Sequence, residues 1–196
     1  MDNITNTINF LFEVGSLRHI QRSYNQHLLQ TTESVAEHSH RVIIIAYILA
    51  TKANANPYKT MLMATFHDLA ETRTGDFNWH QKQYCTANEQ SILEKQILSL
   101  GSNFNDLKNI LDEYKKRKTL ESKLAKDADY MEYILSLKEH ELTGNLEAKR
   151  RIIKEEHLDH FYTPIAKELV KKIIKSKPNS WYQADRKSTA KYSKAK

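Results

Sequence analysis

Residues 66–71 read FHDLAE, so His67 and Asp68 stand side by side within a run of apolar residues. Aspartate disfavours the interior of a helix and is costly to bury unless it is paired or bound to a metal ion. Adjacent helical residues differ by about 100° in direction, so these two side chains can approach one point only from opposite sides. A divalent cation would give them a reason to converge, and Glu71, one turn after His67, could hold a water molecule there.

The sequence around this stretch predicts helices almost throughout. Only four glycines and three prolines occur in 196 residues, which excludes an all-β fold with its frequent turns. Apolar residues recur at helical spacing, and we expect an all-α domain of six or seven helices. Thr31 or Thr32 is expected to cap the second helix, and Thr163-Pro164 to bend the last one. The expected helices cover residues 3–14, 33–53, 57–72, 87–100, 105–117, 120–142 and 146–174.

Composition predicts a soluble, cytoplasmic protein. A hydrophobic content of 40% with 28% charged residues excludes a disordered chain. The single cysteine, Cys85, cannot form an internal disulfide, which fits a reducing compartment. The N-terminus lacks the basic region of a signal peptide. The longest apolar run, residues 42–50, is about half of a membrane span, so no membrane partner is expected.

The positive charge of the chain lies at its C-terminal end. Residues 175–196 hold seven of the 30 basic residues and one of the 24 acidic residues, which leaves 23 of each in residues 1–174. We therefore expect a charge-balanced domain over residues 1–174 and a flexible basic tail over residues 175–196. The tail also carries Trp181, Tyr182 and Tyr192, so a nucleic-acid-binding module is an alternative from a different functional class.

Two further segments carry candidate ligands. His38 lies on the apolar stripe of the second helix, where the alternative to a metal ligand is a core histidine bonded to a carbonyl. In residues 120–142, Asp127 and Asp129 border the apolar stripe on opposite sides, and periodicity does not choose between them.

The order of these motifs resembles the HD-domain family of metal-dependent phosphohydrolases. SVAEHS at 34–39, FHDLAETRTGD at 66–76 and KDAD at 126–129 are similar to the branch that contains the bacterial 5′-deoxynucleotidases and their eukaryotic relatives. The resemblance covers residues 5–165 and implies an HD-domain helical bundle. It also implies a homodimer.

The resemblance implies a role for each site residue. It assigns metal ligation to His38, His67, Asp68 and Asp129, and so selects Asp129 over Asp127. Glu71 corresponds to the catalytic acid that positions or deprotonates the attacking water. Arg22 matches an arginine that contacts the phosphate, and Asp76 matches the residue that recognises the deoxyribose 3′-hydroxyl.

Three positions bear on substrate preference. In the deoxynucleotidases a tryptophan follows the phosphate-binding arginine, whereas this chain has Ser23 and then Tyr24. Arg73 is a further candidate for phosphate binding, with pairing to a carboxylate as its alternative. Trp79 is a candidate wall of the base pocket, with packing inside its loop as the alternative.

The sequence thus predicts a phosphohydrolase that uses one divalent ion (Mn, Co, Fe, Zn or Mg). We expect release of phosphate from nucleoside 5′-monophosphates, the deoxy forms above all, by attack of a metal-bound water. The enzymatic alternative is a deoxynucleoside triphosphate hydrolase that releases tripolyphosphate. The expected partner is a small nucleotide, and nucleic acid is expected only through the tail.

Overall fold

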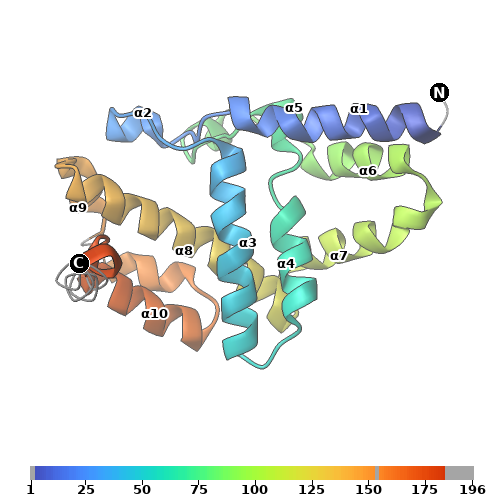
Figure 1. The fold of residues 1–196 in the computed structure, drawn as a ribbon. Coiled ribbons are helices and arrows are strands. Elements are labelled where there is room, and N and C mark those ends of the chain that lie inside the picture. Colours follow the sequence, from blue (N-terminus) through green and yellow to red (C-terminus); the bar gives the residue numbers. More distant parts are fainter. Residues whose placement is uncertain (1–2, 153–154, 184–196) are drawn as a thin grey trace, which may run out of the picture.

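The computed structural model describes residues 3–152 and 155–183, which contain ten α-helices and no β-strand. This confirms the all-α fold (Figure 1). The helices are α1 (Asn3–Gly15), α2 (Asn25–Leu28), α3 (Val35–Lys52), α4 (Pro57–Phe66), α5 (Glu71–Thr74), α6 (Glu89–Leu100), α7 (Asn105–Lys116), α8 (Leu120–Leu142), α9 (Leu146–Ile152) and α10 (Pro164–Lys175). Two predicted helices are split in the structure, and α2 lies in a segment for which no helix was predicted, so the described residues contain more helices than expected.

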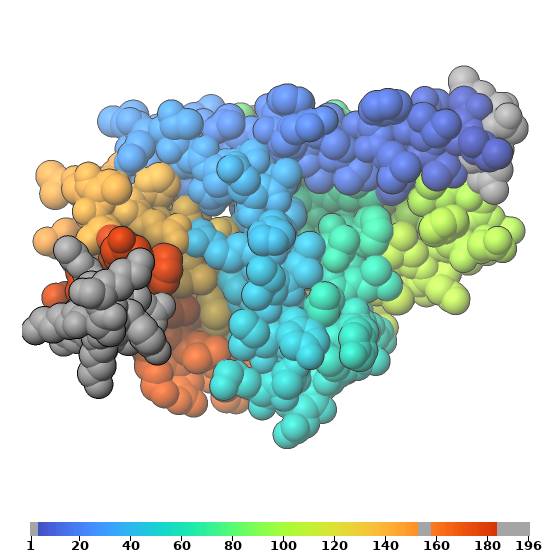
Figure 2. Space-filling view, in the orientation of Figure 1, coloured from blue at the N-terminus to red at the C-terminus, as the bar shows by residue number. Residues whose placement is uncertain are grey.

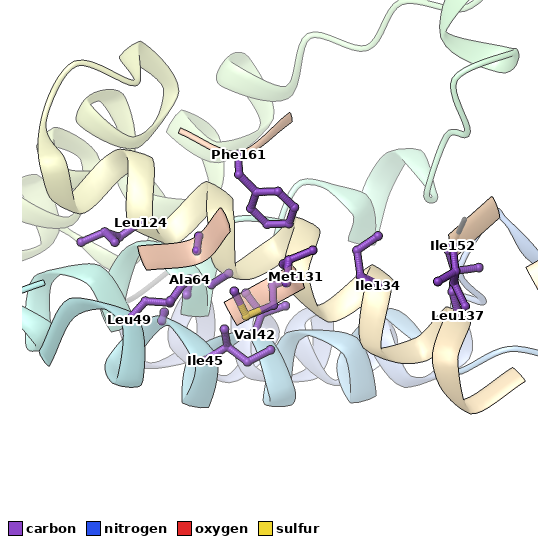
Figure 3. Packing of buried hydrophobic residues seen from close by; sticks show 14 of the residues in the cluster. Val42, Ile45, Leu49, Ala64, Leu124, Met131, Ile134, Leu137, Ile152 and Phe161 are labelled. Atoms are coloured by element: carbon purple, nitrogen blue, oxygen red, sulfur yellow. The ribbon is translucent and has the colours of Figure 1, made fainter. Parts of the chain in front are cut away.

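The main core lies where α3, α4 and α8 cross and α9 and α10 pack against α8. Figure 3 shows Val42, Ile45 and Leu49 of α3 facing Met131 and Ile134 of α8. Their spacing is that of an amphipathic helix, and burial of such a stripe is what stabilises these helices. The predicted apolar face of the second helix, His38 included, is therefore confirmed as the buried face of α3.

Helix α3 begins one residue after Ser34, and the predicted cap at Thr31 or Thr32 is wrong. The Ser34 hydroxyl accepts a hydrogen bond from the Glu37 backbone N–H, and the Glu37 carboxylate accepts one from the Ser34 backbone N–H. This reciprocal pair satisfies two donors that the first turn leaves open, so it fixes the start of the helix.

The predicted single helix over 57–72 is wrong, because the chain leaves the α-helix after Phe66. Backbone bonds from Leu69 N to Phe66 O and from Glu71 N to Asp68 O span three residues instead of four. These tighter turns separate α4 from the short helix α5. His67 and Asp68 therefore lie at this break, directly after the last residue of α4.

The predicted bent helix over 146–174 is also wrong, because α9 and α10 are separate helices with a 3₁₀ segment, Glu155–His160, before α10. Thr163 caps α10, and Pro164 occupies its first turn, where a missing N–H costs nothing. Most of the predicted flexible tail, residues 184–196, lies outside the described residues.

Helix α1 packs on α6 at the side of the molecule away from α9. In the space-filling view its surface forms a band along the upper edge (Figure 2). Within the described part of the chain, no helix has the length and apolar character needed to cross a membrane.

Candidate metal centre

Four side chains from α3, the end of α4 and α8 converge on one point. The Nε2 atoms of His38 and His67 lie 3.3 Å apart. Asp68 Oδ2 lies 3.1 Å from His67 Nε2 and 3.5 Å from His38 Nε2. Asp129 Oδ1 lies 3.2 Å from His38 Nε2 and 3.8 Å from His67 Nε2. The structure therefore brings together all four residues to which the resemblance assigns metal ligation.

Both histidines are held with Nε2 directed at this point. His67 Nδ1 lies 2.7 Å from the carbonyl oxygen of Ala64, and His38 Nδ1 lies 2.5 Å from Glu132 Oε2. When Nδ1 donates to these oxygens, the neutral ring presents its Nε2 lone pair to the cluster. Donor atoms about 3 Å apart suit neighbouring ligands that each lie about 2.1 Å from one ion. Two imidazoles and two carboxylates therefore fit a divalent transition metal.

The charges of the cluster explain its pKa shifts. Burial lowers the pKa of His67, but the neighbouring Asp68 and Asp129 outweigh it and raise that pKa well above its ordinary value. Burial likewise lowers the pKa of His38, and the hydrogen bonds to Asp129 and Glu132 raise it overall. The pKa of Asp129 is well below its ordinary value despite burial, because Lys126 and the two histidines stabilise its charge. Metal binding would replace the protons that the histidines take up.

Arg22, Glu71 and Asp76 surround this centre. Arg22 Nη1 lies 3.2 Å from Asp68 Oδ2 and 3.3 Å from Asp76 Oδ2, and the Ser23 backbone N–H donates to Asp76 Oδ2 at 2.9 Å. Burial, followed by the charges of Asp68 and Asp76, raises the pKa of Glu71 to about 9. Among the described residues, buried Arg22 Nε and Glu71 Oε2 have no hydrogen-bond partner. Such orphaned atoms at a charged cluster are available to a ligand or an ordered water.

Glu132 and Arg41 support the centre, and sequence reasoning did not single them out. The buried Glu132 carboxylate contacts His38 and accepts from Arg41 Nε at 3.0 Å and Nη2 at 2.6 Å. Because it is ionised and pairs with both, its pKa stays below the ordinary value despite burial. The available signal was a glutamate four residues after Ala128, close to the apolar stripe of α8.

Lys126 is a third residue that sequence reasoning left without a role. Its Nζ lies 2.5 Å from Asp129 Oδ2, the oxygen other than the one nearest the histidines. The pKa of Lys126 is raised, chiefly by the charge of Asp129. The ion pair holds that carboxylate so that one oxygen is fixed by lysine and the other faces the histidines.

Asp127 has a different position from Asp129, on the opposite side of α8. It accepts hydrogen bonds from Tyr162 N at 2.7 Å, Thr163 N at 2.9 Å and the Thr163 hydroxyl at 2.6 Å. Asp127 therefore anchors the start of α10, and Asp129 alone of this pair reaches the cluster.

The structure does not bring Arg73 to the centre. Its guanidinium is partly exposed and makes two bonds to Glu13, at 2.6 and 2.9 Å, which is the carboxylate pairing weighed as the alternative. Trp79 is 62% exposed and lines a cleft together with Ser23 and Tyr24. It lies beside the centre and is not part of it.

Comparisons of the sequence with known proteins point to one family. A family model described as HD domain matches residues 14–173. The 5′-deoxynucleotidase HDDC2 of Dictyostelium discoideum is 30% identical over 70% of this chain and 79% of its own length. A 5′-deoxynucleotidase of Cronobacter sakazakii is 32% identical over 63% of this chain and 70% of its own.

A solved structure has a similar fold. A conserved hypothetical protein from Pyrococcus furiosus superposes with a TM-score of 0.66 at 26% identity, covering 86% of this chain and 99% of that one. The family model spans most of the chain, and the convergent His, His-Asp and Asp residues lie inside the matched region. The chain therefore belongs to the HD-domain family of enzymes, as the order of its motifs predicts.

Proposed function

We propose that the protein is a metal-dependent phosphohydrolase that releases phosphate from nucleoside 5′-monophosphates, with the deoxy forms preferred. The observation that carries the proposal is the convergence of two histidine Nε2 atoms and two carboxylates on one point. Beside that point lie Arg22 and Glu71, each of which has one buried atom without a hydrogen-bond partner among the described residues. The two relatives above, both named 5′-deoxynucleotidases, support the substrate class.

His38, His67, Asp68 and Asp129 would hold one divalent ion. When bound, such an ion neutralises phosphate charge and makes water more acidic. The charge of Asp68 raises the pKa of Glu71, and a bound cation would offset that charge. The Glu71 carboxyl would then be ionised, and its carboxylate could accept a proton from water. Glu71 Oε2 has no other hydrogen-bond partner among the described residues, and it is free for that water.

Arg22 and Asp76 would bind the two ends of the sugar phosphate. The Arg22 guanidinium can donate its unpartnered Nε–H to a phosphate oxygen and stabilise charge that develops during hydrolysis. Asp76 keeps Oδ2 on Arg22 and Ser23, so Oδ1 is the oxygen that would accept from a 3′-hydroxyl. Because an ion pair holds Asp76 next to Arg22, the two residues would bind the sugar hydroxyl and the phosphate at a fixed distance from one another.

A phosphate-release screen over nucleoside mono-, di- and triphosphates with Mn²⁺, Co²⁺, Mg²⁺ and Zn²⁺ tests the proposal. We expect phosphate from dAMP and dGMP, loss of turnover in Glu71→Gln with metal content intact, and retained turnover in the matched surface control Glu139→Gln. No phosphate from any nucleotide with metal-loaded protein would refute the proposal. Tripolyphosphate from dATP would favour the triphosphate hydrolase instead.

The homodimer that the family resemblance implies and the cytoplasmic location that the composition predicts stay predictions. Sedimentation of the metal-loaded protein at micromolar concentration tests the first.

A further inference from the structure

A cleft of about 650 Å³ opens beside the candidate metal centre. Three of the residues that line it lie within three positions of a residue at or beside the centre. Tyr24 follows Arg22 by two positions, Trp79 follows Asp76 by three, and Tyr130 follows Asp129 by one. A ligand whose phosphate lies at Arg22 therefore has this cleft next to it. The volume is within the range of small-molecule sites, roughly 300–1,000 Å³.

The inner wall of the cleft is aromatic and held in place. The rings of Tyr24 and Tyr133 meet edge to face, with centroids 5.2 Å apart, and the rings of Tyr130 and Tyr133 lie 5.8 Å apart. The Tyr24 hydroxyl is bonded to Glu33 and to Ser136, so its ring cannot turn away. Fixed aromatic rings favour a flat aromatic ligand, since stacking then costs little ordering.

Among the described residues that line this cleft, one buried polar atom lacks a hydrogen-bond partner. His27 lines it from α2, and its Nε2 atom is buried without a hydrogen bond to any described residue. A buried polar nitrogen of this kind is destabilising unless a ligand or water pairs with it. The unpartnered atoms on Arg22 and Glu71 belong to the reaction centre, whereas His27 belongs to the aromatic cleft.

We propose, resting on the nucleotidase function above, that this cleft binds the nucleobase, prefers purines, and reads the base through His27. The size of the cleft favours a two-ring base, because a single ring would leave part of the tyrosine wall in contact with water. Ser23 on the cleft wall has a small side chain and leaves room for the larger base. His27 Nε2 then makes the directed hydrogen bond that stacking cannot supply.

The test compares dAMP with 2-deoxyribose 5-phosphate, which has the same reacting phosphate and no base. The measured quantity is the ratio of their kcat/KM values in the wild type, His27→Ala, His27→Gln and the matched control His40→Ala, whose side chain is exposed outside the cleft. We expect His27→Ala to lower the ratio about tenfold, mainly through KM for dAMP. His27→Gln, which keeps a donor and an acceptor, is expected to recover most of it, and His40→Ala to leave it unchanged.

A ratio within twofold of wild type in His27→Ala, or equal efficiency for dCMP and dAMP in the wild type, would overturn the inference. If neither dAMP nor the sugar phosphate is hydrolysed, the nucleotidase function fails separately. Fluorescence of Trp79 in a Trp181→Phe background then decides the cleft by titration. Tighter binding of dAMP than of 2-deoxyribose 5-phosphate, lost in His27→Ala, supports it, and equal binding refutes it.

Discussion

Replacing Glu132 by glutamine tests whether a carboxylate behind His38 sets the metal affinity of the centre. The fully buried carboxylate contacts His38 Nδ1 at 2.5 Å and Arg41 at 2.6 Å. Glutamine has the same shape and can still accept from Nδ1–H, but it lacks the charge that makes the imidazole a stronger ligand. Loss of such a supporting carboxylate typically weakens metal binding about 10- to 100-fold.

The magnitude follows from mass action. A metal at 100 times its dissociation constant stabilises the folded protein by about 2.7 kcal/mol, and tenfold weaker binding reduces this to about 1.4 kcal/mol. Glu132→Gln should therefore lose about half of the metal-induced stabilisation. In the metal-free protein it should also unfold more readily, because Arg41 is left with a weaker buried partner.

The assay is denaturant unfolding with and without Mn²⁺, together with metal affinity by competition against a chelator. Glu139→Gln is the matched control. Glu139 lies on α8, as Glu132 does, and accepts a hydrogen bond from Arg41 at 2.6 Å, but its side chain is half exposed. If Glu132→Gln keeps the full metal-induced stabilisation, or loses no more than Glu139→Gln, the reasoning about His38 is refuted.

Three other outcomes are expected. Because folding raises the pKa of Glu71 from 4.5 to about 9, the metal-free folded state binds more protons than the unfolded state between these values, and its stability falls as pH rises through that window. Metal-free Glu71→Gln should therefore melt above the wild type at pH 8 and not at pH 4, and equal melting at pH 8 would contradict the shift. Asp127→Ala should lower stability by about 2–5 kcal/mol in denaturant unfolding, since three donors lose their acceptor, while chelator competition finds metal affinity unchanged. Deletion of residues 184–196 should leave kcat/KM for dAMP unchanged, and loss of hydrolysis would disprove the independence of domain and tail. Salt-dependent binding to DNA that disappears on this deletion would favour the nucleic-acid-binding alternative.

Local pattern was sufficient for much of the fold and for the identity of the cluster. The apolar stripe of α3 predicted the burial of His38, because a helical period places it between Val35 and Val42. The bounds of α8, predicted at Leu120 and Leu142, are confirmed, and in the structure Thr119 caps the start of the helix. Both features depend on residues that are close together in the sequence, so the sequence pattern is sufficient to predict them.

Contacts between distant residues were not predictable in the same way. The turn after Phe66 was not predicted, because Phe66, Leu69 and Ala70 continue the apolar pattern of the helix and Asp68 is the one residue there that disfavours a helix interior. The roles of Glu132 and Asp127 depend on partners 94 and 36 residues away, at His38 and Thr163. Periodicity placed Asp127 and Asp129 on two sides of one helix and could not tell which side held the histidines.

The four residues KDAD at 126–129 therefore set the register of α8 for two purposes. Asp127 positions α10, and Asp129, steadied by Lys126, faces the histidines. Inserting one residue in the first turns of α8 would rotate both carboxylates by about 100° relative to the rest of the bundle. Loss of metal affinity and detachment of α10 should then occur together, and neither could be repaired without the other.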